Sequence, residues 1–143
     1  MAIVKAVCIS EKRGTRKLQV PSIKVKIDHG IVGDAHAGNW HRQISLLAEE
    51  SIEKLRECGI QLEPGVFAEN IVTEGIDLVS LQVGIRLRVG NAELKITQIG
   101  KECHNDCEIK RTAGRCVMPT EGVFAVVLSE GEIFPGDLIE ILE

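Results

Sequence analysis

The sequence contains few aromatic residues: one Trp, three Phe and no Tyr among 143 residues. Proteins that read bases by stacking, or that hold cations in aromatic cages, need several such side chains, so both functions are disfavoured. Positive charge is also in the minority, because 21 Asp and Glu against 17 Lys and Arg leave a formal net charge of −4. Nucleic-acid binding requires a cationic surface. We therefore expect no nucleic-acid partner.

Long hydrophobic runs are absent as well. No apolar stretch approaches the ~20 residues that a membrane-spanning helix needs, so we expect no membrane association. Residues 1–8 lack a long apolar core followed by a small-residue cleavage site, and we interpret them as a first strand rather than a signal peptide. Five cysteines are an odd number for a disulfide framework. The expected location is the cytoplasm, where free thiols can act as ligands or nucleophiles.

Short runs that alternate between apolar and polar residues, separated by Gly and Pro turns, dominate the chain. Such alternation is typical of antiparallel strands with one face buried. Gly90-Asn91 is a tight-turn dipeptide between two alternating runs, so these runs are predicted to form a β-hairpin. The strand candidates are residues 23–27, 85–89, 92–99, 122–128 and 138–142.

One helix is predicted over residues 47–58. Apolar residues recur there at helical spacing, and Gly59 is placed to cap the end. The fold class is therefore mostly β, with one or a few short helices, in a single domain over residues 1–143. A barrel-like arrangement is favoured because closure removes exposed sheet edges.

Charge is unevenly distributed along the chain. Residues 1–27 hold seven basic side chains against one acid, whereas residues 120–143 hold six acids and no base. One interpretation is that the terminal strands pair and neutralise each other. The other is that residues 12–17 form a cationic loop that binds an anion. Because charge runs are usually solvated faces, we favour the first.

The densest group of reactive residues follows the predicted hairpin, at residues 98–107. Cys103 lies between Lys101 and His104, and a neighbouring ammonium or imidazolium stabilises the nucleophilic, metal-binding thiolate. A strand end is also a place where a rigid element positions a group that a loop leaves accessible. Four possible zinc ligands are also present here, namely Cys103, His104, Cys107 and Cys116. A structural zinc site usually shows paired knuckles, and only one such pair is present, so zinc is the weaker interpretation.

Two further groups could line a polar pocket. The first is residues 33–43, in which His36, His41 and Arg42 lie close together, and a binding role for at least one is plausible. The second is residues 64–71, in which Glu69 and Asn70 could fix backbone loops or hydrogen-bond a ligand. No phosphate-binding glycine loop or serine-hydrolase motif is present.

These groups resemble the MOSC family, the domain found at the C-terminus of molybdenum cofactor sulfurases. The resemblance is closest to compact, stand-alone bacterial members and rests on five segments that follow one another in family order. They are Gly33-Asp34-Ala35-His36-Ala37-Gly38, residues 41–47 (HRQISLL), residues 64–71 (PGVFAENI), residues 98–104 (QIGKECH) and residues 118–124 (MPTEGVF).

The resemblance implies a MOSC-type β-barrel and a role in molybdenum cofactor metabolism. The family cysteine falls on Cys103, which would be the catalytic group, carrying sulfur or binding molybdenum as a thiolate. The implied contacts to the cofactor, molybdopterin, are Lys101, His104, Arg42, His36 and Asn70. The sulfurases carry a separate pyridoxal-phosphate domain that 143 residues cannot contain, so no pyridoxal phosphate is expected. A cysteine desulfurase or a cofactor biosynthesis protein is the expected partner.

Two functional classes follow. The first is a cofactor-binding or sulfur-carrier protein, and it leaves open whether the chain turns over a substrate as a sulfurtransferase or an oxidoreductase. The second is a cysteine-rich zinc or thiol redox module without molybdenum. In either class Cys8 and Cys58 lie on apolar faces and are expected to be buried and inert. Cys103 is expected to react fastest with a thiol reagent.

Overall fold

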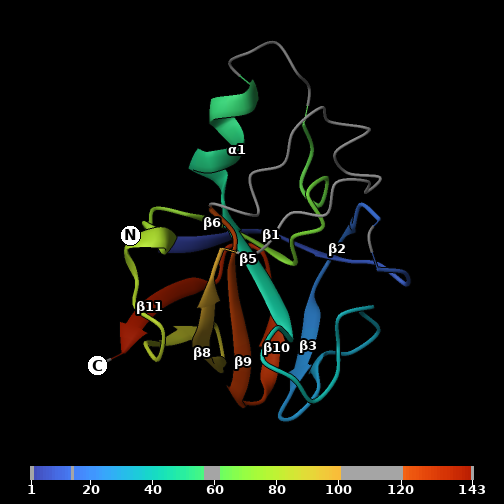
Figure 1. Cartoon of the computed structure of the whole chain (residues 1–143), viewed down its shortest axis with the longest axis vertical. Coiled ribbons are helices and arrows are strands. Elements are labelled where there is room, and N and C mark those ends of the chain that lie inside the picture. The colour runs from blue at the N-terminus through green and yellow to red at the C-terminus, as the bar shows by residue number, and fades with distance from the viewer. Residues whose placement is uncertain (1, 14, 57–61, 101–120, 143) are drawn as a thin grey trace.

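A computed structural model of the chain describes residues 2–13, 15–56, 62–100 and 121–142. The elements are β1 (Ala2–Ile9), β2 (Leu18–Val20), β3 (Ile23–Lys26), β4 (Gly30–Ile31), β5 (Ile44–Ala48), α1 (Glu49–Arg56), β6 (Ile71–Glu74), η1 (Leu78–Ser80), β7 (Arg86–Val89), β8 (Ala92–Ile99), β9 (Val123–Ser129), β10 (Gly131–Ile133) and β11 (Leu138–Leu142). The expected mostly β fold is confirmed (Figure 1).

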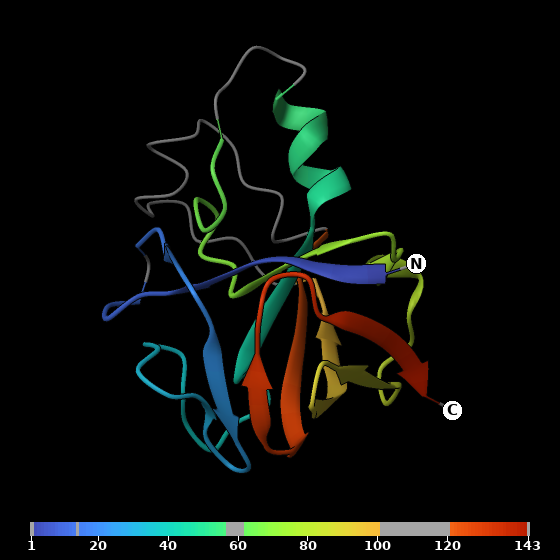
Figure 2. The ribbon, with the colours of Figure 1, turned by 180° about the vertical axis from the view of Figure 1, so that it is seen from behind.

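Seven strands close into a barrel in the order β11-β7-β8-β9-β5-β6-β1, with β2 attached to the outside of β1. Closure comes from pairing of β1 with β11, in which Ile3 lies opposite Leu138. The β5–β6 pair is parallel, whereas the other described pairs in this sheet are antiparallel. A smaller sheet, β10-β3-β4, lies beside the barrel (Figure 2). Closure thus removes the edges of the seven-stranded sheet, which is the reason for which a barrel was expected.

The barrel interior follows the alternation of the sequence. On β8 the side chains of Ala92, Leu94 and Ile96 are buried in the main core, while Lys95 faces out. The predicted hairpin is confirmed as β7 and β8, joined at Gly90. A second core lies between the barrel wall, α1 and residues 62–72, and it contains Phe67.

The helix begins later than predicted. Leu47 and Ala48 belong to β5, because this strand pairs with β6 through Leu47 opposite Val72 and Ala48 opposite Thr73. All five residues of β5 are buried, since the strand has the main core on one face and the second core on the other. A strand that is buried on both faces has a continuous apolar sequence, which periodicity alone does not distinguish from the start of a helix. The predicted C-terminal end and the Gly59 cap lie outside the described residues.

The terminal segments pair, as the first interpretation of the charge asymmetry expects, but no ion pair joins residues 1–27 to residues 120–143 within the described structure. Besides the β1–β11 contact, β3 pairs with β10, and Lys24 lies opposite Glu132. The ion pair of Lys5 is made instead with Glu74, from the middle of the chain. In the ranges that the structure describes, no helix is long and apolar enough to cross a membrane.

Candidate functional site

The predicted reactive centre lies outside the described residues. This holds for Lys101, Cys103, His104, Cys107 and Cys116, so their roles stay predictions. The described residues on either side of this segment meet at one place. The Gly100 N–H donates to the carbonyl of Gly122 at 2.7 Å, and Ile99 pairs with Val123. The chain therefore leaves the barrel and rejoins it at one end of the β8–β9 pair.

Aromatic and cationic side chains gather beside this end, four from the segment between β4 and β5 and one, Arg13, from the loop after β1. We call Arg13, His36, Trp40, His41 and Arg42 the Trp40 face. The Trp40 Nε1–H donates to the His36 carbonyl at 2.7 Å, and the two rings stack with centroids 6.4 Å apart and planes 8° apart. His41 packs edge-on against Trp40 at 5.8 Å. Trp40 is thus held in one orientation by its own segment.

Two guanidinium groups lie over the Trp40 ring. The central carbon of Arg42 is 4.9 Å from the ring centroid and that of Arg13 is 5.1 Å from it. Arg42 also lies 5.5 Å from the Phe124 ring. Its Nε is buried and has no hydrogen-bond partner within the described structure. Because unpaired buried polar groups are costly, this N–H marks a place where the described structure lacks a hydrogen-bond acceptor.

His41 connects the Trp40 face to β8. The Gln98 amide nitrogen donates to the Gly100 carbonyl at 2.7 Å, which leaves its oxygen to accept from His41 Nε2 at 2.9 Å. The Thr97 hydroxyl also donates to the His41 carbonyl. The Trp40 face, which includes the predicted residues His36 and Arg42, therefore contacts β8 through His41, and β8 is the strand that precedes the Cys103 segment.

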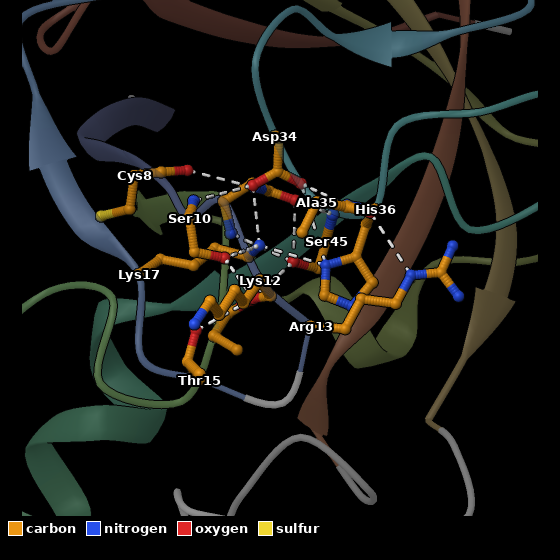
Figure 3. Close-up of polar contacts among 12 residues, drawn as sticks. Cys8, Ser10, Lys12, Arg13, Thr15, Lys17, Asp34, Ala35, His36 and Ser45 are labelled. Atoms are coloured by element: carbon orange, nitrogen blue, oxygen red, sulfur yellow. Dashed lines mark hydrogen bonds and ion pairs between the residues drawn. The ribbon is translucent and has the colours of Figure 1, made fainter.

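Beneath the Trp40 face lies a buried polar group that sequence reasoning missed, the Lys17 cluster of Ser10, Lys17, Asp34 and His36 (Figure 3). The Lys17 side chain is 0% exposed, and its ammonium donates to Asp34 at 2.7 Å, Ser10 Oγ at 3.1 Å and His36 Nδ1 at 3.1 Å. Asp34 also accepts from the backbone N–H groups of Ser10 and His36. The cluster thus joins the loop after β1 to the loop after β4.

The charges of this cluster support one another. Burial alone would raise the pKa of Asp34, but the hydrogen bond and charge of Lys17 and the backbone N–H of His36 hold it well below its ordinary value. Burial lowers the pKa of Lys17, while the hydrogen bond and charge of Asp34 oppose that change. A buried ion pair persists when its remaining hydrogen bonds are satisfied in this way.

Ser10 is not set up as a nucleophile by its lysine neighbour. Its hydroxyl donates to the Lys12 carbonyl at 3.0 Å, so its oxygen can only accept from Lys17. A Ser–Lys dyad needs the reverse direction, with the amine accepting the hydroxyl proton. The cluster is therefore a rigid support for the Trp40 face rather than a hydrolytic centre.

Asn70 is fully buried between the end of β1 and the start of β5. Its amide donates to the Cys8 carbonyl at 3.0 Å, and its oxygen accepts from the Ser45 N–H at 3.0 Å. These bonds tie the end of β1 to the start of β5, which is one of the two roles that the sequence left open. A contact between Asn70 and a cofactor stays a prediction that these bonds do not favour.

Glu69 holds the neighbouring turn. Its buried carboxylate accepts from the Gly65 N–H at 2.8 Å and the Phe67 N–H at 3.0 Å. Burial raises its pKa from the ordinary 4.5 to about 7, against the opposing effect of these hydrogen bonds. The folded state therefore binds this proton more tightly than the unfolded state does.

The free energy of unfolding is expected to fall as the pH rises from 4.5 through about 7, because Glu69 must then ionise while buried. At about 1.4 kcal/mol per pKa unit, the total loss is about 3 kcal/mol. Urea unfolding of the wild-type and Glu69→Gln proteins across this interval measures it. The Glu69→Gln protein should be less stable, but its free energy of unfolding should not show this fall with pH. Equal dependence of the free energy of unfolding on pH in the two proteins would contradict the assignment.

Cys8 is buried, as predicted. Its side chain is 0% exposed, and burial raises its pKa to about 12, with Glu69 adding to the rise and Lys17 opposing it. Cys58 lies outside the described residues. We expect Cys8 to stay unmodified by iodoacetamide in the native protein and to react only on unfolding, which peptide mapping by mass spectrometry will show. Native modification of Cys8 at the rate found for Cys103 would refute this.

No three His, Cys, Asp or Glu side chains gather as a metal site in the part of the chain that the structure describes. The zinc alternative concerns Cys103, His104, Cys107 and Cys116, which lie outside that part.

Comparisons with known proteins agree with this fold. The YUAD protein from Bacillus subtilis is 20% identical with a TM-score of 0.78, and the match covers 99% of this chain and 96% of that one. YiiM from Geobacillus stearothermophilus is 18% identical with a TM-score of 0.76, covering 100% and 76%. YiiM from Escherichia coli is 18% identical with a TM-score of 0.72, covering 100% and 70%. No match was found among curated proteins.

At these identities the solved structures show the fold alone. The family assignment comes from the sequence, because the model of the MOSC domain matches residues 33–140. This range includes His36, Trp40 and Arg42 of the Trp40 face as well as Cys103. The expected resemblance is confirmed: the chain belongs to the MOSC domain family, which is linked in general to molybdenum cofactor-related proteins.

Proposed function

We propose that this protein binds the molybdenum cofactor and acts as a cofactor-binding or sulfur-carrier protein through Cys103. The observation that carries the proposal is Arg42, whose buried Nε–H has no partner within the described structure. This group lies on the Trp40 face, next to the strand end from which the Cys103 segment departs. Membership of the MOSC family supplies the class of cofactor.

The described residues fit the anionic part of such a cofactor. Molybdopterin carries a phosphate, and guanidinium groups bind phosphate through charge-assisted hydrogen bonds. Arg42 and Arg13 would hold it, with His36 as a third contact, and their ring contacts with Trp40 restrict both guanidinium groups. When bound, the cofactor supplies the molybdenum chemistry. Lys101, His104 and Asn70 stay predicted contacts.

Cys103 is proposed as the group that carries sulfur or binds molybdenum, because both favour a soft thiolate. In sulfur transfer the Cys103 thiolate attacks the outer sulfur of a partner's persulfide. A new S–S bond forms on Cys103, the partner's S–S bond breaks, and the partner's thiolate leaves. A cysteine desulfurase of the cytoplasm, or a cofactor biosynthesis protein, is the proposed partner. An oxidoreductase activity of the bound cofactor is the other turnover that this site could support.

The proposal is tested by the composition of protein purified from molybdate-replete cells. We expect molybdenum and pterin in equal amounts, measured by elemental analysis and by pterin fluorescence after oxidation. Arg42→Gln should lower both about tenfold or more, because a lost charge-assisted contact is worth about 1.5–3 kcal/mol. Arg88→Gln is the matched control, since Arg88 is an exposed arginine on the outside of β7.

The opposite result is equally clear. Stoichiometric zinc without pterin would reject the proposal and support the zinc or thiol redox module. Equal cofactor content in Arg42→Gln and Arg88→Gln would show that the Trp40 face does not hold the cofactor.

A further inference from the structure

The ammonium of Lys17 determines how His36 can be protonated. An ammonium has three N–H donors and no acceptor. All three are used, by Asp34 Oδ1 at 2.7 Å, Ser10 Oγ at 3.1 Å and His36 Nδ1 at 3.1 Å. His36 Nδ1 must therefore present a lone pair to Lys17. In a neutral imidazole the proton then lies on Nε2.

The other arrangement of protons has poor geometry. A proton on Nδ1 would point at the Lys17 ammonium 3.1 Å away. Its carboxylate neighbour among the described residues, Asp34 Oδ2, is 3.8 Å from Nδ1, which is too far for a hydrogen bond, and that oxygen already accepts from the His36 N–H at 3.0 Å. The carboxylate of Asp34, 2.7 Å from the Lys17 nitrogen, favours the ammonium form of Lys17 against the effect of burial. His36 Nε2–H is thus a hydrogen-bond donor.

The two guanidinium groups of the Trp40 face are also donors, because a guanidinium has no acceptor. His41 uses its Nε2–H on Gln98. Arg13 and Arg42 lie over Trp40, and neither forms an ion pair within the described ranges of the chain. The nearby carboxylate, Asp34, is 0% exposed in its side chain, and its oxygens are occupied inside the Lys17 cluster. His36 itself is 27% exposed and can contact a ligand.

We infer that the Trp40 face is an oxyanion site. Lys17 donates to His36 Nδ1, and it thereby keeps the His36 Nε2–H as a donor alongside Arg13 and Arg42. Lys17 is a positioning residue, because it is buried and acts only through His36. The inference rests on the proposed function. It adds that the ligand group bound here is one that only accepts hydrogen bonds. That group is a phosphate, either of a bound cofactor or of inorganic phosphate.

The primary test is the tautomer of His36 in the wild-type protein. A long-range ¹H–¹⁵N NMR spectrum at neutral pH should show a protonated Nε2 and an unprotonated Nδ1. A protonated Nδ1, in the other tautomer or in an imidazolium, would overturn the inference. The wild-type spectrum is used because Lys17→Met would leave Asp34 buried and unpaired.

A second test asks whether the face binds an anion without the cofactor. In Cys103→Ser protein, inorganic phosphate should shift the His36 and Trp40 signals in a saturable way. Adding Arg42→Gln should raise the dissociation constant about tenfold or more, whereas adding Arg88→Gln should leave it within about twofold. No saturable shift, or equal effects of the two substitutions, would reject the site.

The two proposals fail separately. If wild-type protein carries molybdenum and pterin but the Cys103→Ser protein does not bind phosphate, the proposed function stands and the oxyanion site is wrong. If phosphate binds but no cofactor is present in any preparation, the site accepts a free phosphate group and the proposed function is wrong.

Discussion

Asp34→Ala is expected to lower the free energy of unfolding by about 3–5 kcal/mol. The substitution leaves the Lys17 ammonium 0% exposed without its carboxylate, and it removes the acceptor of the Ser10 and His36 backbone N–H groups. Breaking a buried ion pair on one side is costly because the other charge stays desolvated. Urea unfolding followed by circular dichroism measures the change.

The matched control for Asp34→Ala is Glu11→Ala, an exposed acid of the loop after β1, which should change stability by at most about 0.5 kcal/mol. The double variant Lys17→Met/Asp34→Ala should recover part of the loss, since it removes the unpaired charge. A loss below about 1 kcal/mol for Asp34→Ala would contradict the buried pair.

Gly65→Ala is expected to cost about 2–5 kcal/mol. The φ angle of Gly65 is +93°, which alone penalises an L side chain by about 1–2 kcal/mol. A Cβ there would also lie 2.8 Å from the Lys17 carbonyl carbon and closer still to its oxygen. The Lys17 N–H donates to the Gly65 carbonyl at 2.7 Å, so neither backbone can retreat without losing that bond. Such overpacking adds about 1–3 kcal/mol.

Gly136→Ala separates the two contributions. Gly136 has the same φ of +93°, but nothing lies within 4 Å of a Cβ at that position. It should therefore show only the conformational cost, about 1–2 kcal/mol. Thermal unfolding of both variants measures the difference, and equal losses would show that the contact between Gly65 and Lys17 carries no steric weight.

The strands were predictable because their alternation is local. Leu94 and Ile96 face the core at a period of two, and the Gly90-Asn91 turn joins their strand to its neighbour. The start of the helix was not predictable in the same way. Leu47 and Ala48 have no local sign of being a strand, and their assignment to β5 depends on pairing with β6, more than twenty residues later in the chain.

The candidate site was predictable only in part. His36 and Arg42 could be selected because they are polar groups in a glycine-framed segment. The Lys17 cluster was missed because its partners are 17 residues apart on two loops, so no local spacing links them. Lys17 was assigned to a solvated charge run, although it is the one lysine among the described residues that is 0% exposed. The signal available in the sequence was the cationic run at residues 12–17 together with an acid, Asp34, in a separate glycine-framed segment.

The most direct test of the account is the molybdenum content of Cys103→Ser protein purified from molybdate-replete cells. We expect molybdenum and pterin to be lost while the thermal unfolding temperature stays at the wild-type value, because the substitution removes the proposed sulfur ligand and leaves Arg42 and the barrel intact. Cys8→Ala, which changes a buried thiol, should retain both. Full retention of molybdenum by Cys103→Ser protein would contradict the claim that this thiolate holds the cofactor.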